Sequence, residues 1–459
     1  MSAARGALAR RRAGVLLHPT ALPGPGGSLG PSARAFIDWL ASAGFSVWQV
    51  LPLGPTGADR SPYRARSDMA GNAELIHWQE APDPQRDHAD LEAFCRRSAA
   101  WLDDYVLFEA LAAEQGGVPW WQWPAALRDR DAAALQQART RLAGDLKRRQ
   151  VEQWVFERQW QALRAYAHGH GVLLFGDLPI YVAPDSASTW AEREQFQLLP
   201  DGRPALLAGV PPDYFSADGQ LWGNPLYDWR QAEKDRFSFW RARLTMQLGR
   251  FDLVRIDHFR GLEAYWAVPA GAPNARSGQW FPAPGAELLS ALADQHTQLP
   301  LIAEDLGVIT PPVEALRQRF GLPGMRVLQF GFDGSPTNTH LPHNFTIDAV
   351  AYTGTHDNDT TLGWYQSLDK ATVRRVDEYL ASRAPMPEAL VRAALGSVAQ
   401  LAIVPVQDLL GLGGEARFNT PGTATGNWSW RLWERPLGEE LALRYQELNF
   451  QFGRQVSRE

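Results

Sequence analysis

The sequence predicts an α/β protein whose core is a closed barrel of eight parallel strands. Eight short apolar runs recur along the chain, and each is followed by polar or turn residues at its C-terminal end. Helical patterns separate several of the runs, and buried strands that alternate with helices are typical of a (β/α)8, TIM-type barrel. The runs comprise residues 15–17, 47–51, 172–175, 253–256, 301–303, 326–330, 349–352 and 401–406.

Two of the intervening helices are predicted by the patterns over residues 33–43 and 313–320, and Thr310 followed by two prolines marks the start of the second. An open doubly wound sheet is the alternative arrangement of the same elements. It is disfavoured because no GxGxxG follows the first run and because the helices do not alternate tightly enough with the strands. In a barrel, the polar residues that follow the runs meet at one rim, where the active site lies.

Two long insertions interrupt the alternation. Residues 81–169, between the second and third runs, are helical and charge-rich, and we expect an inserted helical subdomain there. Residues 183–229, between the third and fourth runs, are rich in Pro, Gly, Asp and aromatic residues, which favours an inserted substrate-binding loop region. We therefore expect residues 1–459 to form one catalytic barrel that carries both insertions.

Composition excludes several classes of function. The 459 residues are 45% hydrophobic, which is enough for a large core, and the net charge of −6 gives no basic field for nucleic acid. The single cysteine, Cys95, excludes a disulfide framework and a thiolate zinc cluster within the chain. The basic N-terminus leads into an apolar run of five residues, 13–17, and no run approaches the ~18 residues of a membrane helix. We expect a mature, soluble, cytoplasmic protein without a membrane partner.

The segment FDLVRIDHFRG, residues 251–261, places charges in a buried strand. Side chains alternate along a strand, so Leu253, Arg255 and Asp257 share one face, and a buried pair of charges needs compensating partners. A structural ion pair is one explanation. A functional explanation comes from four carboxylates at or just past strand ends, which a barrel brings to one rim: Asp177, Asp257, Glu304 and Asp357.

Two carboxyl groups, one ionised and one protonated, are what cleavage of a glycosidic bond requires. Arg255 would keep Asp257 ionised, which predicts a nucleophile at this position. Three apolar residues precede Glu304 and would raise its pKa, which predicts the general acid/base. Asp305 beside it leaves that second assignment open.

The same residue types also bind metal ions, so a zinc or magnesium site is the competing interpretation. Barrel metallohydrolases place HxH after the first strand, where this chain has His-Pro-Thr from residue 18. Its HxH, at His168 and His170, precedes a strand instead. We therefore predict no metal. We interpret His356 as a neutral hydrogen-bond donor or orienting group, with a buried core histidine as the alternative.

Six motifs together resemble those of a known family: FDLVRIDHFRG, LIAEDLG, GTHDNDTT, GDLPIYV, LWGNPLYDW and TPGTATGNWSWR. They are similar to motifs of 4-α-glucanotransferases of the amylomaltase or disproportionating-enzyme type, glycoside hydrolase family 77. The resemblance extends from about residue 18 to about residue 431. It implies an amylase-type barrel with insertions, no separate C-terminal β-sandwich and no cofactor.

The resemblance also implies a reaction. The family's nucleophile falls on Asp257, its general acid/base on Glu304 and its transition-state carboxylate on Asp357. Positions that match supporting or substrate-contacting residues are Arg255, His356, Asp177, Ser61, Tyr63, Trp222 and Asn224. The expected reaction is the retaining transfer of a segment of an α-1,4-glucan to the 4-hydroxyl of another glucan, with α-1,4-glucans and maltooligosaccharides as donors and acceptors. An α-glucan hydrolase and a non-catalytic glucan-binding protein are the alternatives.

Metal removal tests the interpretation of the carboxylates. Because the sequence has neither a strand-end HxH nor a cysteine cluster, we expect prolonged EDTA treatment to leave glucan transfer nearly intact. The measurement is the rate of maltotriose disproportionation before and after chelation, with mock-dialysed protein as the control. A loss of activity that zinc or magnesium restores would assign the strand-end carboxylates to a metal.

Overall fold

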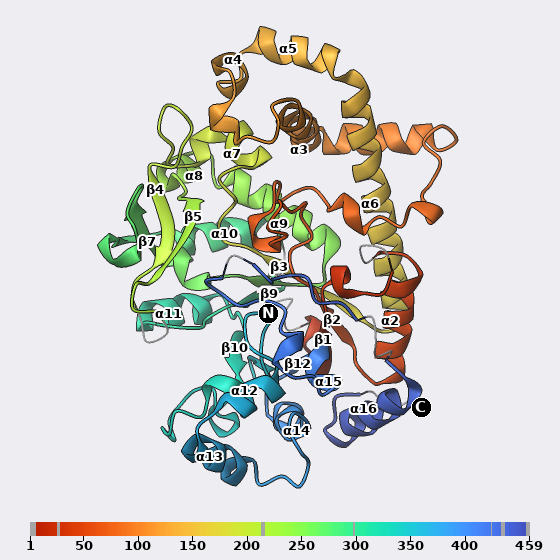
Figure 1. Cartoon of the computed structure of the whole chain (residues 1–459), viewed down its shortest axis with the longest axis vertical. Helices are drawn as coiled ribbons and strands as arrows, with labels where there is room; N and C mark the ends of the chain where they lie inside the picture. The colour runs from red at the N-terminus through yellow and green to blue at the C-terminus, as the bar shows by residue number, and fades with distance from the viewer. Residues whose placement is uncertain are drawn as a thin grey trace.

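A computed structural model describes residues 6–24, 28–212, 216–296, 299–423, 425–432 and 437–455. At its centre is a closed barrel of parallel strands in the order β1-β12-β11-β10-β9-β6-β3-β2 (Figure 1). The strands are β1 (Arg12–Leu16), β2 (Val47–Gln49), β3 (Leu173–Leu178), β6 (Leu253–Ile256), β9 (Leu301–Ala303), β10 (Gly324–Val327), β11 (Ala349–Tyr352) and β12 (Leu401–Pro405). The predicted fold class is confirmed. Among the described residues no strand follows β12, so this part of the chain contains no C-terminal β-sandwich.

Each of the eight apolar runs overlaps a barrel strand, and the bounds of the strands differ from those of the runs at β1, β2, β3, β10 and β12. β2 ends at Gln49, two residues before the end of its run, as the chain approaches Pro52. β10 begins at Gly324, where a Cβ atom would lie 2.3 Å from an oxygen of the buried Asp305. The apolar pattern missed this start because the position requires a glycine. The last three residues of that run, Leu328–Phe330, form a 3-10 helix.

Helices surround the barrel (Figure 1). They are α2 (Pro31–Ser42), α3 (His88–Glu114), α4 (Ala125–Arg128), α5 (Ala132–Arg141), α6 (Ala143–Gly169), α7 (Ala187–Ala191), α8 (Trp229–Lys234), α9 (Ser238–Arg250), α10 (Gly285–Gln295), α11 (Pro311–Arg319), α12 (Thr361–Ser367), α13 (Lys370–Leu380), α14 (Glu388–Gly396), α15 (Val406–Leu409) and α16 (Glu439–Gln451). α2 and α11 confirm the two predicted helical patterns. Thr310 is at the N-cap of α11, but its side chain makes no capping hydrogen bond. Of the described helices, none has the length and hydrophobicity needed to cross a membrane.

The two expected insertions contain regular structure. Between β2 and β3 lie α3 to α6. Of these, α3, α4 and α5 form one end of the molecule (top of Figure 1), and α6 runs from that end to the barrel. Residues 183–229, of which 213–215 lie outside the described residues, contain α7 and the strands β4 (Leu206–Val210) and β5 (Gln220–Pro225). The boundaries of both insertions stay predictions.

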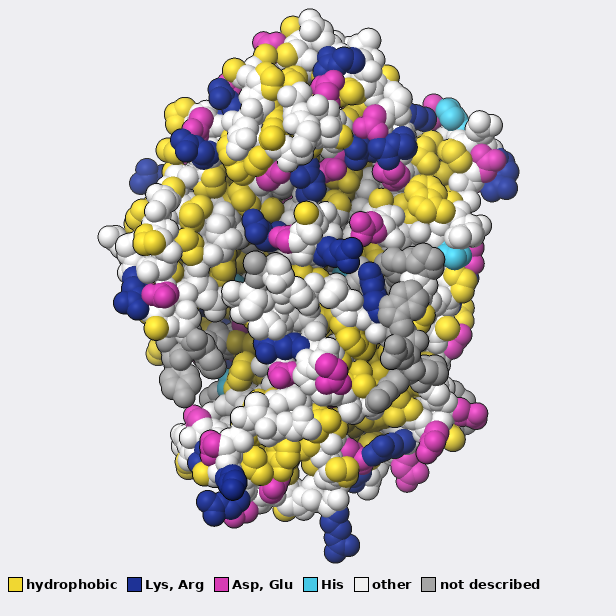
Figure 2. Space-filling model, viewed as in Figure 1, with side chains coloured by type: hydrophobic (Ala, Val, Ile, Leu, Met, Phe, Trp, Pro, Cys, Tyr) yellow, Lys and Arg dark blue, Asp and Glu magenta, His cyan; other side chains and the backbone are white. Residues whose placement is uncertain are grey.

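A second, antiparallel sheet lies to one side of the barrel (left in Figure 1) and has the order β5-β4-β7-β8. It joins β4 and β5 to β7 (Ala264–Pro269) and β8 (Gln279–Pro282), which follow β6 in the chain. The sequence analysis did not predict this sheet, because its strands come from segments on opposite sides of a barrel strand. Over the face shown in Figure 2, Lys and Arg side chains are interspersed with Asp and Glu, so that face has no extended field of one sign.

Strand register brings the charged residues together. Asp177 on β3 is the register partner of Arg255 on β6. On the other side of β6, Ile256 is paired with Ala303 of β9, so the residues that follow them, Asp257 and Glu304, leave the barrel next to each other. The parallel alignment of three neighbouring strands therefore determines the centre of the site.

Candidate active site

Arg255 bridges two carboxylates at the rim of the barrel. Its Nη1 donates hydrogen bonds to Oδ1 and Oδ2 of Asp177 at 2.8 and 2.7 Å, and its Nη2 lies 2.7 Å from Oδ1 of Asp257. The Asp177 and Arg255 side chains are 0% and 6% exposed, whereas that of Asp257 is 29% exposed. The buried charge is thus compensated within the barrel, and the chain of ion pairs ends on a carboxylate that a ligand can reach.

Tyr63 closes the other side of Asp177. Its hydroxyl donates to Oδ2 of Asp177 at 2.6 Å, and its ring stacks on that of His356 with centroids 5.1 Å apart. Burial raises the pKa of Tyr63 well above its ordinary value, so the hydroxyl remains a donor. Ser61 immediately precedes the 3-10 helix Pro62–Arg64, and its backbone N–H donates to Asp59 at 3.2 Å.

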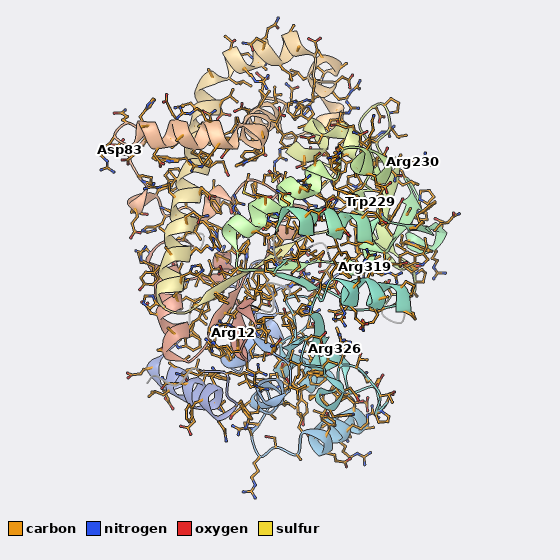
Figure 3. The ribbon with its side chains drawn as sticks, turned by 180° about the vertical axis from the view of Figure 1, so that it is seen from behind. Arg12, Asp83, Trp229, Arg230, Arg319 and Arg326 are labelled. Carbon is orange, nitrogen blue, oxygen red and sulfur yellow. The ribbon has the colours of Figure 1, made fainter. Side chains whose placement is uncertain are left out.

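Backbone N–H groups hold the Glu304 carboxyl. His258 donates to its Oε2 at 2.7 Å and Leu306 donates to its Oε1 at 3.0 Å. The neighbouring Asp305 turns toward β10, where it accepts a hydrogen bond from the Met325 N–H at 2.7 Å and pairs with Arg326 (Figure 3) at 3.2 Å. The two adjacent carboxyls therefore have different partners. Asp305 is bound to β10, whereas Glu304 accepts a hydrogen bond from the segment that follows Asp257.

The Asp257 and Glu304 carboxyls both resist ionisation. Burial raises the pKa of Asp257 to about 7, and the nearby carboxylates add to this effect, while Arg255 opposes it. The expectation that Arg255 keeps this group ionised is therefore wrong, because burial raises the pKa of Asp257 by more than Arg255 lowers it. Burial likewise raises the pKa of Glu304, against the effects of Arg255 and the two N–H donors. Neighbouring carboxyls of this kind favour a state in which one is ionised and the other protonated.

Asp357 is held from the C-terminal part of the chain. Its Oδ1 accepts a hydrogen bond from Asn419 Nδ2 at 2.6 Å and lies 3.3 Å from Nε2 of His356, and its backbone carbonyl accepts from Arg417 at 2.6 Å. Burial lowers the pKa of His356, although Asp357 opposes this, so the neutral imidazole is favoured. The sequence analysis missed Asn419 and Arg417, because they lie in a loop just before the TPGT motif and not directly after a strand.

Trp222 and Asn224 differ in what they can offer a ligand. Trp222, on β5, is half-buried and meets the ring of His258 edge-on at 4.8 Å. Asn224 is buried, and its amide nitrogen donates to the carbonyl of Val182 at 2.8 Å, so this donor already holds the chain after β3 in place. Two cavities of about 30 Å³ flank the cluster, one beside His356 and one beside Tyr63. Each has room for a water molecule.

The described residues contain no group of three or more His, Cys, Asp or Glu side chains arranged to hold a metal ion. The HxH histidines lie at the end of α6, and their ion-pair partners are not residues of the rim. His168 pairs with Asp252 at 2.9 Å, and His170 lies 3.5 Å from Asp38.

The raised pKa of Asp257 makes stability depend on pH. The folded protein binds this proton more tightly than the unfolded chain, whose aspartates titrate near 3.9, so stability is lost as pH rises from about 4 to about 7. Asp257→Asn removes this loss. We expect its Tm to exceed that of the wild type at pH 8 and to match it near pH 4, as measured by thermal unfolding across pH.

Asp294→Asn, at an exposed position on α10, is the matched control. It should leave the difference in Tm between pH 4 and pH 8 as in the wild type. A lower Tm for Asp257→Asn at pH 8 would show that the ion pair with Arg255 outweighs desolvation.

Comparison with known proteins agrees with this geometry. Residues 17–82 and 78–435 match the family model described as 4-alpha-glucanotransferase. The chain is 47% identical to the 4-alpha-glucanotransferase of Thermus thermophilus, over 95% of this chain and 97% of the relative. It is 43% identical to that of Synechocystis, over 98% and 99%. The structure resembles an amylomaltase from Streptococcus agalactiae solved with acarbose, with a TM-score of 0.94, 34% identity, and coverage of 97% of this chain and 100% of that one. The chain therefore belongs to the 4-alpha-glucanotransferases of glycoside hydrolase family 77.

Proposed function

We propose that this protein transfers a segment of an α-1,4-glucan to the 4-hydroxyl of a second glucan and holds the segment on Asp257 between the two steps. The observation that carries the proposal is the placement of Asp257 and Glu304 after the paired strands β6 and β9, with Arg255 beside them. Maltooligosaccharides are the proposed donors and acceptors. The proposed compartment is the cytoplasm, because one cysteine in 459 residues is typical of a reducing environment.

The first step cleaves the donor. Ionised Asp257 attacks the anomeric carbon and forms a glycosyl ester, while protonated Glu304 donates its proton to the departing 4-oxygen. The part of the donor with the new 4-hydroxyl then leaves. In the second step an acceptor 4-hydroxyl loses its proton to Glu304 and attacks the anomeric carbon, which releases Asp257. Two displacements retain the configuration, and this geometry requires the two carboxyl groups to lie about 5 to 5.5 Å apart.

The remaining residues of the cluster have proposed roles that follow from their contacts. Asp177 and Tyr63 orient Arg255, which in turn orients the Asp257 carboxylate. Neutral His356 and the Asp357 carboxylate, whose side chain is 46% exposed, provide a donor and an acceptor for sugar hydroxyls. Trp222 presents an aromatic surface for the apolar face of a sugar ring.

The product pattern separates transfer from hydrolysis. From maltotriose we expect glucose and a ladder of longer maltooligosaccharides with little net gain in reducing ends, because a sugar hydroxyl rather than water resolves the glycosyl ester. Thin-layer chromatography combined with a reducing-end assay measures both. A steady rise in reducing ends, without any oligosaccharide longer than the substrate, would identify a hydrolase instead.

Substitution of the two carboxyls tests their roles. Asp257→Ala should abolish transfer and hydrolysis, because no group remains to form the ester. Glu304→Gln should slow maltotriose turnover by at least about 100-fold, the usual range for loss of a general acid, yet still react with an activated donor whose leaving group needs no proton. Mass spectrometry of Glu304→Gln after such a reaction should find the glycosyl group on the peptide that contains Asp257.

Asp294→Asn again serves as the unaffected control. An adduct on another residue, or full activity in Asp257→Ala, would contradict the assignment.

A further inference from the structure

Arg260 lies three residues after Asp257, in the 3-10 helix Phe259–Leu262, and the mechanism above does not use it. Although arginine is charged, this residue is 7% exposed. Its Nη1 donates to the backbone carbonyl of Val308 at 2.6 Å, and its guanidinium carbon lies 3.9 Å from the ring centroid of Trp280 on β8. Among the described residues, no carboxylate lies within ion-pair distance of it. Glu263 acts on its charge from farther away, and a carbonyl and an aromatic face are its direct contacts.

These contacts connect two segments that are separate in the chain. One follows Asp257 and the other follows Glu304. They are joined by the His258 N–H to the Glu304 carboxyl, by the Phe259 N–H to the Glu304 carbonyl at 3.1 Å, and by Arg260 to Val308. Of the three links, the one from Arg260 is made by a side chain and reaches farthest from the strands.

Both segments need restraint to keep the Glu304 carboxyl in place. His258, which donates one of its two hydrogen bonds, has left-handed backbone angles of φ 51° and ψ 50°, and such a conformation is costly outside glycine. Leu306, which donates the other, is followed by Gly307 at φ 81° and by Val308, whose side chain is 59% exposed. Backbone in so exposed a position is readily displaced unless a tether holds it.

We propose that Arg260, stacked on Trp280, is a positioning residue for Glu304, because it clamps together the two segments whose N–H groups hold that carboxyl. This inference rests on the proposed role of Glu304 as the general acid/base. On the opposite side, Asp305 fixes the start of the same segment to β10 through Met325. The carboxyl is thereby held from both sides, and the second sheet, through β8, contributes to the alignment of a barrel residue.

The clamp has a consequence for proton transfer. The charges that act most on Glu304 are those of Arg255, Asp257 and Asp305, and all three remain when Arg260 is replaced. What changes is the pair of N–H hydrogen bonds, which favour the ionised carboxylate. If these bonds loosen, the pKa of Glu304 rises. Arg260→Met also removes a positive charge, which acts in the same direction, whereas Arg260→Lys retains it. The basic limb of the kcat/KM profile, which requires protonated Glu304, should therefore move to higher pH.

The test compares Arg260→Met with Arg260→Lys. Methionine retains the length of the stem but loses the hydrogen bond to Val308 and the charge over Trp280. We expect a fall in kcat with maltotriose of about 10- to 100-fold, typical of a misplaced catalytic group, with a much smaller change in KM. Lysine can still donate to the carbonyl and lie over the ring, so it should restore most of kcat. With an activated donor that needs no proton, the loss in Arg260→Met should become much smaller.

Arg319→Met is the matched control, because Arg319, at the end of α11 (Figure 3), also lies over an aromatic ring, that of Phe320 at 5.4 Å, without bridging the two segments. Trp280→Leu provides an independent variant if Arg260→Met does not fold. It should move the basic limb of the kcat/KM profile in the same direction, but by less. Wild-type kcat and an unchanged pH profile in both folded variants would overturn the inference, as would an equal loss with activated and natural donors. If wild-type protein forms no maltooligosaccharide ladder, it is the proposed function that fails.

Discussion

The buried charge of Arg255 is the constraint on which this site depends. A guanidinium that is 6% exposed requires polar partners to compensate its charge, and here two carboxylates provide them. Asp177 meets this requirement from β3 and Asp257 meets it from the end of β6, so the register of these strands and the position of Asp257 are coupled. Tyr63 adds a hydrogen bond to Asp177 and thereby connects the ion pairs to the ring of His356.

A purely structural ion pair would not need the rest of the cluster. Asp177 alone accepts two hydrogen bonds from Arg255, yet Asp257 and Glu304 also act on the same charge, and Asp357 acts on Asp257. One guanidinium cannot compensate all of them, so burial and mutual repulsion raise the pKa of Asp257 and Glu304. An arrangement that holds like charges together at the expense of stability is typical of a functional site. For glycosyl transfer it has the correct consequence, because one proton shared by two carboxyls supplies both a nucleophile and an acid.

Backbone groups, rather than side chains, align the second carboxyl. The N–H groups of His258 and Leu306 reach Glu304 because the segments after β6 and β9 run beside each other at the rim. The antiparallel sheet outside the barrel takes part in this arrangement, since Trp280 of β8 covers Arg260. The second sheet, although outside the barrel, is thus in contact with the segment that follows Asp257.

The sequence by itself determined the barrel, the family and the residues that meet at the rim, because the C-terminal ends of all strands of a parallel barrel lie at the same rim. It also predicted α2 and α11 from local pattern alone. The tertiary structure decided what depends on distant neighbours. It separated Glu304 from Asp305 by pairing the latter with Arg326, gave Asn419 to Asp357, and assembled the second sheet from segments on either side of β6. It also reversed the expected pKa shift of Asp257, since desolvation depends on everything packed around a group, and the identity of the neighbour two residues away does not reveal it.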